Sequence, residues 1–484
     1  MKFLALLIAV LLISSVLAWG DSDVATVVSN ATALRERGDF KGADALLGKT
    51  LDAKDISTAD RKKLLFQRDL LMRLKHDYSL TKEQLFASLR DSVKDLTRKE
   101  FEQWVAEGRF DSRPIDGTIR YMYASDSNIY FSNPELLPRQ MDGKDEASIE
   151  KGRLALSRLI TKAAVAGGTP YVLPHHFRCV MTVTAKRDAV PPGETVRAWI
   201  PVPRKYPFQT DFKMAGSSSP IKDMEPENSP IRSVYLEQLA QTGEPTRFQI
   251  SYSYTEYGVH FTLDPKRIQP PDLNDPELKK FVTESPHVVF TPKIKALAVE
   301  IAGKETNPML QARAFYDWIG GNITFRYARE YSTLTNISDY TLSNHYGDCG
   351  EEAMLFITLC RYKGIPARWQ AGWNTFPGGV SNHDWAEIYL APYGWLPVDP
   401  CIGMSALRSP SLTADERREL HDFYFGSLDF YRMAANSDHS QALHPEKNAP
   451  RSDDVDFQRG ELEYRDNNIY LDKFNYSLRV EDFQ

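Results

Sequence analysis

The chain has 484 residues, of which 42% are hydrophobic, 11% aromatic and 26% charged. This composition is typical of globular proteins and excludes a largely disordered chain and a polytopic membrane protein, and the length predicts about three domains. The formal net charge of −6 provides no basic excess to neutralise a phosphate backbone, so we expect no nucleic-acid partner.

Residues 1–18 are predicted to be a secretory signal peptide. Lys2 supplies a positive charge, residues 3–13 form an apolar run, and small residues up to Ala18 form a cleavage site. The apolar run is too short to span a bilayer as a helix. We therefore expect a secreted or periplasmic protein that is cleaved after Ala18 and keeps no stable membrane span.

The next segment, residues 19–170, is predicted to be mainly helical, because apolar residues recur at spacings of three and four between residues 34 and 74. A further helix is expected at residues 146–166. The tyrosines that flank a short polar stretch within residues 118–131 indicate a short strand pair.

The apolar period changes to two near Phe177. Alternating runs at residues 177–185, 196–202 and 248–254 are separated by turns rich in proline and glycine, which predicts an antiparallel β-sandwich over residues 171–270. Two consecutive prolines then mark a linker, since neither can continue a ladder or a helix.

The remaining chain is expected to form two parts. Residues 271–410 begin with helical patterns at residues 294–302 and 309–319 and contain the motifs described next. Residues 411–484 are expected to be a C-terminal extension that is charged and irregular and ends in strand-like segments.

Cys349 begins the segment with the most chemical information. Asp348 is a good N-cap and Glu351 follows three residues later, so a capping box is predicted at the start of a helix that ends at Gly364. The free N–H groups and the dipole of a helix N-terminus lower the pKa of a thiol. Cys349 is therefore the candidate nucleophile, and its own amide a candidate oxyanion donor. Asn344 and Tyr346 are candidate second donors.

A nucleophilic cysteine needs a base, and the base needs an orienting group. His383 follows Cys349 by 34 residues and begins an alternating strand. Asp399 lies 16 residues after His383, at the end of the next strand. A hairpin of these two strands would place the carboxylate beside the imidazole and select its tautomer.

These segments resemble the transglutaminase-like superfamily of papain-like cysteine enzymes. The resemblance rests on Gly347-Asp348-Cys349 and on residues 364–368, 383–389 and 394–400, in that order. It implies an α+β fold: a papain-like transglutaminase core, preceded here by a helical N-terminal region and an antiparallel β-sandwich.

The resemblance also implies roles for single residues. Cys349 would be the nucleophile, His383 the base and Asp399 the orienting carboxylate. Asp384 occupies a position where an alanine often follows the histidine of the family.

Nothing in the sequence predicts a cofactor or a metal. His175 and His176 have no third ligand at metal-binding spacing, and no Cys-x-x-Cys motif occurs. Cys179 and Cys360 are expected in the core, while Cys401 could form a disulfide with either of them in an exported protein, a pairing that the sequence leaves open.

The expected function is an exported thiol acyl-transfer enzyme that acts on peptide or amide bonds of a protein or peptide substrate through a Cys-His-Asp triad and a thioester. Hydrolysis, as in a peptidase or amidase, is favoured because water needs no second binding site. The alternatives are a protein-crosslinking transglutaminase and a catalytically inactive transglutaminase-like binding module.

Overall fold

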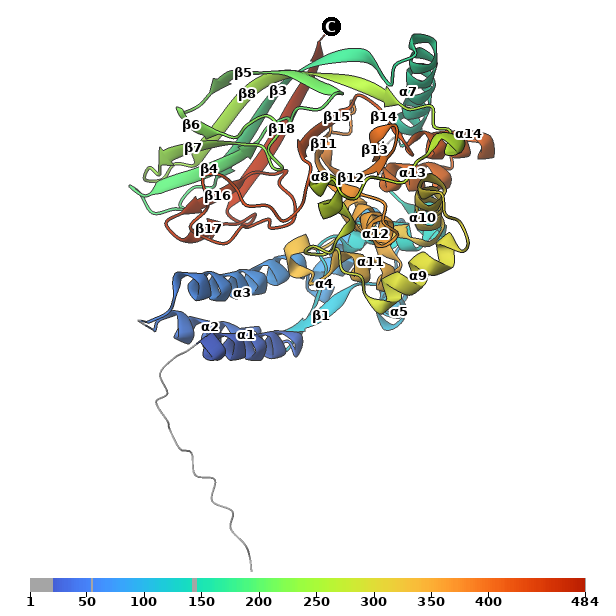
Figure 1. Ribbon diagram of the computed structural model, residues 1–484. Helices are drawn as coiled ribbons and strands as arrows, with labels where there is room; N and C mark the ends of the chain where they lie inside the picture. Colours follow the sequence, from blue (N-terminus) through green and yellow to red (C-terminus); the bar gives the residue numbers. More distant parts are fainter. Residues whose placement is uncertain (1–20, 54, 142–145, 484) are drawn as a thin grey trace, which may run out of the picture. The chain divides into compact units, whose positions relative to one another are not determined.

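A computed structural model describes residues 21–53, 55–141 and 146–483. The predicted signal peptide and its cleavage site therefore lie outside the described residues. The chain divides into two compact units, residues 1–71 with 114–118, and residues 72–113 with 119–484 (Figure 1).

The first unit is helical within the part that the structure describes. It contains α1 (Asp21–Glu36), α2 (Phe40–Leu51) and the first part of α3 (Thr58–Asp77). The Asp39 side chain accepts a hydrogen bond from the Gly42 amide and so caps α2. The apolar spacing that predicted these helices is explained by the fully buried side chains on one face of α2, Phe40, Ala43 and Leu47.

The second unit begins with short helices. They are α4 (Lys82–Ser92), α5 (Arg98–Ala106), α6 (Ser125–Ser132) and the 3₁₀ helix η1 (Pro134–Arg139), and the long helix α7 (Glu146–Gly167) follows them. The helix expected at residues 146–166 is confirmed by α7.

The strand pair expected at residues 118–131 is only partly correct. The strands are β1 (Ser112–Ile115) and β2 (Thr118–Tyr121), and residues 125–132 form α6 instead. Ile129 and Tyr130 of α6 are buried in one apolar cluster with Leu85 of α4 and Phe101 of α5. Tertiary packing against these helices has therefore decided the conformation of a segment whose sequence shows no strong period.

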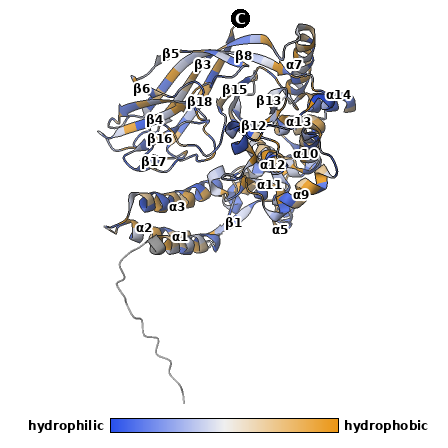
Figure 2. Cartoon of the chain, in the orientation of Figure 1, coloured by the Kyte–Doolittle hydropathy of each residue, from blue (hydrophilic) through white to orange (hydrophobic). Residues whose placement is uncertain are grey.

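The predicted sandwich is present as two antiparallel five-stranded sheets. One has the order β14-β8-β3-β18, with β5 also paired to β8, and the other has the order β17-β16-β4-β7-β6. The strands in the predicted range are β3 (Tyr171–Ala185), β4 (Thr195–Pro201), β5 (Gln209–Ser217), β6 (Ile221–Met224), β7 (Ser233–Leu239) and β8 (Thr246–His260). Buried residues alternate with more exposed ones along β3 from residue 177 to 185 and along β8 from residue 246 to 254, and Figure 2 colours the strands of this region in hydrophobic and hydrophilic patches.

The rest of the sandwich comes from the end of the chain. Its strands there are β14 (Ser427–Leu428), β16 (Glu461–Tyr464), β17 (Asn467–Ile469) and β18 (Phe474–Phe483). Figure 1 shows β18, coloured red, beside the green strand β3, with which it pairs over residues 176–185. Part of the segment expected to be a C-terminal extension therefore completes both sheets of the sandwich.

The region after the sandwich combines helices with a four-stranded antiparallel sheet of order β13-β12-β11-β15. The strands of this sheet are β11 (Ala367–Asn374), β12 (Ser381–Leu390), β13 (Gly394–Val398) and β15 (Arg432–Asn436). Two further short strands, β9 (Thr324–Phe325) and β10 (Tyr346–Gly347), pair in parallel.

The helices of this region are α8 (Pro276–Lys279), α9 (Pro292–Ala302), α10 (Pro308–Asn322), α11 (Ile337–Asn344), α12 (Cys349–Tyr362), α13 (Pro400–Arg408) and α14 (Ala414–Phe423). The helices expected at residues 294–302 and 309–319 are confirmed by α9 and α10. The fold is α+β, as predicted. Among the described residues, no helix combines the length and the apolar character needed to cross a membrane.

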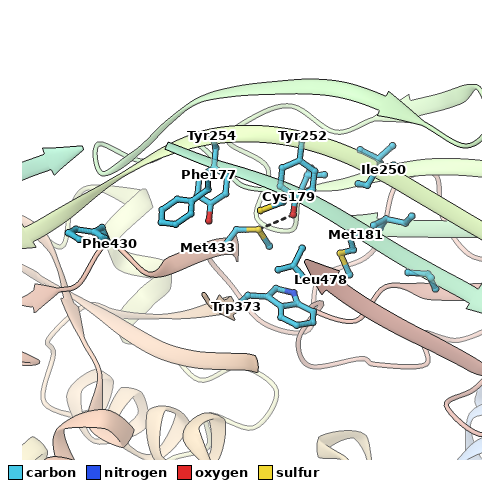
Figure 3. Packing of buried hydrophobic residues seen from close by; sticks show 14 of the residues in the cluster. Phe177, Cys179, Met181, Ile250, Tyr252, Tyr254, Trp373, Phe430, Met433 and Leu478 are labelled. Carbon is cyan, nitrogen blue, oxygen red and sulfur yellow. Dashed lines mark hydrogen bonds between the residues drawn. The ribbon is translucent and has the colours of Figure 1, made fainter. Parts of the chain in front are cut away.

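The β-sandwich and the four-stranded sheet of the second unit contribute side chains to one apolar cluster. Figure 3 shows Trp373 of β11 and Met433 of β15 beside the sandwich residues Cys179 and Leu478. The Tyr252 hydroxyl donates a hydrogen bond to the sulfur of Met433, at 3.1 Å (Figure 3). The sandwich and the four-stranded sheet that contains β11 and β15 are therefore joined by buried apolar contacts.

Gly372 allows β11 and β15 to lie against each other, because a Cβ atom at this position would lie 1.7 Å from the Met433 carbonyl oxygen. We predict that Gly372→Ala lowers the free energy of unfolding by roughly 1–3 kcal/mol, since the strands must separate. Gly321→Ala in α10 is the control, because a Cβ there meets nothing within 4 Å. Thermal unfolding of both variants is the measurement, and equal melting temperatures would contradict this role of Gly372.

Candidate active site

The capping box predicted before α12 is present and positions Cys349. The Asp348 carboxylate accepts hydrogen bonds from the amides of Gly350 and Glu351, both at 3.2 Å, and Glu351 accepts one from the Asp348 amide. Cys349 is the first residue of the helix. All residues from Gly350 to Arg361 are buried, so α12 lies in the interior of the core.

The next residue, Gly350, leaves room for a tyrosine. A Cβ atom at this position would lie 2.2 Å from the hydroxyl oxygen of Tyr331 and 2.8 Å from the ring of Trp369. The absence of a side chain at Gly350 therefore brings the Tyr331 hydroxyl close to the first turn of α12.

The two predicted partners on the sheet are in direct contact. His383 lies on β12, Asp399 follows β13, and the imidazole Nε2 lies 2.7 Å from the Asp399 Oδ2. The same carboxylate accepts hydrogen bonds from the guanidinium of Arg432 at 3.0 Å and, through Oδ1, from the Ile402 amide at 3.0 Å. Asp399 thus also caps α13.

The charges of this pair follow from its surroundings. Burial favours the neutral carboxyl, but the contacts with His383 and Arg432 outweigh it and hold the pKa of Asp399 below its ordinary value. Burial lowers the pKa of His383, although Asp399 opposes this effect. The pair is therefore a carboxylate that holds a neutral imidazole through Nε2, which leaves Nδ1 as the basic nitrogen.

The thiol of Cys349 has a different hydrogen-bond partner from the predicted one. Its sulfur lies 3.6 Å from the Oδ2 atom of Asp384, and the hydrogen bonds of the described residues do not include one from this thiol to His383. Removal from water raises the pKa of Cys349 well above its ordinary value, and the carboxyls of Asp384 and Asp348 raise it further.

The expectation of a lowered thiol pKa is therefore not met in this arrangement. The helix N-terminus favours a thiolate, but burial and two neighbouring carboxyls favour the thiol more strongly. The result is a protonated Cys349 that donates its proton toward Asp384.

Asp384 is held by two further residues that the sequence analysis did not identify. The Tyr331 hydroxyl lies 2.6 Å from an oxygen of Asp348 and 3.2 Å from Asp384 Oδ2. Gln458 donates a hydrogen bond to Asp384 Oδ1 and another, at 3.0 Å, to the His383 carbonyl oxygen. Because the hydroxyl has a single proton and Asp348 is closer, Asp384 Oδ2 is left to accept the proton of the thiol.

Tyr331, Arg432 and Gln458 had no signal in the sequence. Tyr331 lies in a short 3₁₀ turn, η4 (Tyr331–Thr333), and the other two come from the segment expected to be a C-terminal extension. No motif surrounds them, and each reaches the site only through the tertiary fold.

A cavity of about 560 Å³ lies beside Cys349 and His383, whereas Asp399 is fully buried and is not among its lining residues. Cys349, His383, Asp384 and Cys401 are among the residues that line it. Asn344 and Tyr346, the expected second oxyanion donors, are not among its lining residues. The Tyr346 hydroxyl instead lies 3.2 Å from that of Tyr340.

The remaining cysteines are all unpaired in the structure. Cys179 and Cys360 are fully buried, as expected, and burial raises the pKa of each thiol, that of Cys179 to about 12. Cys401 lines the cavity, and neither disulfide considered for it is formed.

Comparison with known proteins finds one matching family model. Residues 295–400 match the family model of the transglutaminase-like superfamily. The chain therefore contains a transglutaminase-like core, as the resemblance predicted, and the matched segment includes Cys349, His383 and Asp399.

Two relatives are described as uncharacterized proteins. One, from Haemophilus influenzae, is 24% identical over 200 residues, which are 35% of this chain and 53% of that protein. The other, YebA from Bacillus subtilis, is 26% identical over 132 residues, which are 23% of this chain and 18% of YebA. The chain thus spans about half the length of the first relative and less than a fifth of the second.

Two solved structures are also similar. A candidate cysteine protease from Cytophaga hutchinsonii has a TM-score of 0.44 and 16% identity, over 65% of this chain and 92% of that one. The periplasmic domain of TgpA from Pseudomonas aeruginosa has a TM-score of 0.26 and 17% identity, over 56% of this chain and 96% of that one.

The contact between Cys349 and Asp384 has a measurable consequence. We predict that Asp384→Asn moves the pH profile of Cys349 alkylation by iodoacetamide to lower pH, because an amide cannot carry the negative charge with which Asp384 opposes the thiolate, although burial and Asp348 also raise the pKa of Asp384 itself. Asp188→Asn, at an exposed turn, is the control. Peptide mapping after brief labelling across a pH series measures the midpoint, and a midpoint unchanged by Asp384→Asn would show that this carboxyl does not control the thiol.

Proposed function

We propose that this protein is a thiol acyl-transfer enzyme acting on peptide or amide bonds, with hydrolysis as its main reaction. The observation that supports this proposal most strongly is the 2.7 Å contact between Asp399 and His383, because His383 lines the same cavity as Cys349, the first residue of a buried helix. A nucleophile, a base and an orienting carboxylate are the groups that acyl transfer requires.

The proposed reaction begins with a change of partner. The Cys349 thiol leaves Asp384 and donates its proton to Nδ1 of His383, and the sulfur attacks the carbonyl carbon of the substrate. The C–N bond breaks as the imidazolium returns the proton to the leaving amine, and a thioester remains on Cys349. Water attacks the thioester with His383 as base, which releases a carboxylic acid and restores the thiol.

Asp399 and Arg432 have positioning roles in this scheme. Asp399 holds the N–H of the imidazole at Nε2, so that Nδ1 carries the lone pair that accepts a proton. Arg432 is fully buried and pairs with Asp399 at 3.0 Å and with Asp429 at 3.3 Å. These contacts keep the orienting carboxylate charged and in place.

The same thioester could be resolved by an amine, which would make the protein a crosslinking transglutaminase. The third alternative is a binding module without catalysis. The hydrogen bond of the Cys349 thiol to Asp384 favours this alternative, because the thiol has no hydrogen bond to the base His383 among the described residues. We also infer that the protein acts outside the cytoplasm, an inference supported by the predicted signal sequence at residues 1–18.

Incubation of the protein with a mixed peptide pool, with and without a labelled primary amine, separates these functions. The hydrolase releases peptides with new carboxyl termini, a transglutaminase incorporates the label, and a binding module does neither. Cys349→Ala is the control and must abolish either product. Label incorporation without cleavage would overturn the hydrolytic proposal.

We predict that Asp399→Asn lowers the single-turnover rate by on the order of a hundredfold or more, because an amide can stabilise the wrong imidazole tautomer. A cysteine enzyme loses less than a serine enzyme, since a thiolate forms more readily than an alkoxide. The melting temperature is measured on the same sample. A lower melting temperature with an unchanged rate would assign Asp399 a structural role as the cap of α13.

A further inference from the structure

The cavity beside Cys349 has more acidic than basic residues on its wall. Four carboxyls line it, those of Glu330, Asp348, Asp384 and Asp456, against the guanidiniums of Arg329 and Arg459. Arg459 is bonded to Glu330 at 2.8 and 2.7 Å and to Asp453 at 2.6 Å. This guanidinium is therefore already neutralised by two carboxylates.

The second guanidinium is directed elsewhere. Arg329 lies over the ring of Tyr340, at 5.2 Å from its centroid. Its carboxylate neighbours are Asp111 and Asp77, neither of which lines the cavity. Asp348 and Asp384, the two carboxyls that act on Cys349, form no ion pair with a basic side chain among the described residues.

Asp456 shows the imbalance most clearly. Its side chain is only 4% exposed, it lines the cavity, and its Oδ1 atom has no hydrogen-bond partner among the described residues. Burial, the neighbouring carboxyls of Asp453 and Asp384 and a side-chain hydrogen bond with Asp453 raise the pKa of Asp456 well above its ordinary value, although Arg459 opposes this effect. Carboxyls this close together in a site with little water cannot all be charged unless a cation lies among them.

The remaining lining residues indicate the kind of cation. Aromatic rings form much of the wall, and they belong to Tyr123, Phe325, Tyr327, Tyr331 and Tyr476. Aromatic faces together with carboxylates are the usual surroundings of organic cations. No three His, Cys, Asp or Glu side chains within the described ranges are placed to hold a metal ion.

We propose that this cavity binds a positively charged amine or guanidinium of the substrate, next to the carbonyl that Cys349 attacks. The proposal rests on the proposed function and adds a substrate class to it. Asp384 and Asp456 would bind the N–H groups of the cation, and the aromatic rings would cover its apolar part.

A cation at this position also affects the nucleophile. Asp384 accepts the thiol proton in the empty site, at a sulfur–oxygen distance of 3.6 Å. When the carboxylate binds an ammonium or guanidinium instead, the thiol is released toward His383. Binding of the charged substrate and activation of Cys349 are thereby coupled through one side chain.

Thiol reagents of different charge test the cation site without requiring catalysis. Cys349 of the full chain is treated with the aminoethyl, hydroxyethyl and sulfonatoethyl methanethiosulfonates, each of which forms a disulfide with the thiolate and expels methanesulfinate. Rates are divided by those of free 2-mercaptoethanol. We expect the cationic reagent to be favoured over the anionic one by about tenfold or more, as for a focused electrostatic site.

Isosteric variants identify the residues that produce the preference for the cationic reagent. Asp384→Asn and Asp456→Asn should each reduce the preference for the cationic reagent severalfold, while Asp188→Asn at an exposed turn should leave it unchanged. Circular dichroism of each variant confirms its fold. An equal preference in the wild type and in both cavity variants, or no preference in the wild type, would overturn the proposal even if the enzyme proves to be active.

A peptide series then identifies the source of the cation. Matched peptides contain lysine, arginine or norleucine beside the scissile bond, each with a free or an acetylated N-terminus. Faster cleavage of the lysine and arginine peptides assigns the cation to a side chain, and faster cleavage of the free N-termini assigns it to the α-ammonium group. Equal kcat/KM values for all six peptides would contradict the proposal, whereas loss of all cleavage together with retained charge selectivity of Cys349 would overturn only the proposed function.

Discussion

The site depends on the contacts of one buried group, the carboxylate of Asp399. It joins three elements, because it contacts His383 on β12, Arg432 on β15 and the Ile402 amide in α13. A fully buried charge is costly unless all of its neighbours compensate it, and removal of one partner leaves the others unpaired. The geometry of the imidazole is therefore coupled to the packing of the whole sheet.

The alternation of side chains along β12 produces the second constraint. Successive residues of a strand point to opposite faces, so His383 contacts Asp399 while Asp384 contacts the start of α12. The residue after the predicted base is thus placed directly against Cys349. The carboxyl of Asp384 keeps the Cys349 thiol protonated in the empty site. The charge of a substrate that enters the cavity can therefore change the reactivity of this thiol.

The C-terminal strands make the sandwich and the core parts of one structure. β15 extends the catalytic sheet, while β16 and β18 pair with the sandwich strands β4 and β3. Gln458, between these strands, reaches the backbone of His383 and the carboxyl of Asp384. The sandwich therefore supports the site through residues that are distant from it in sequence.

Several features could be predicted from the residues alone: the α+β class, the helices of the core, the capping box before Cys349 and the hairpin that pairs His383 with Asp399. Each depends on contacts within a few residues or one turn, and such contacts leave a periodic or positional signal. Only the tertiary structure decided the partner of the thiol, the contributions of Arg432 and Gln458, and the acidic wall of the cavity. These depend on burial and on pairing between strands that can lie hundreds of residues apart, such as β3 and β18, and such long-range contacts are not recorded in any local pattern.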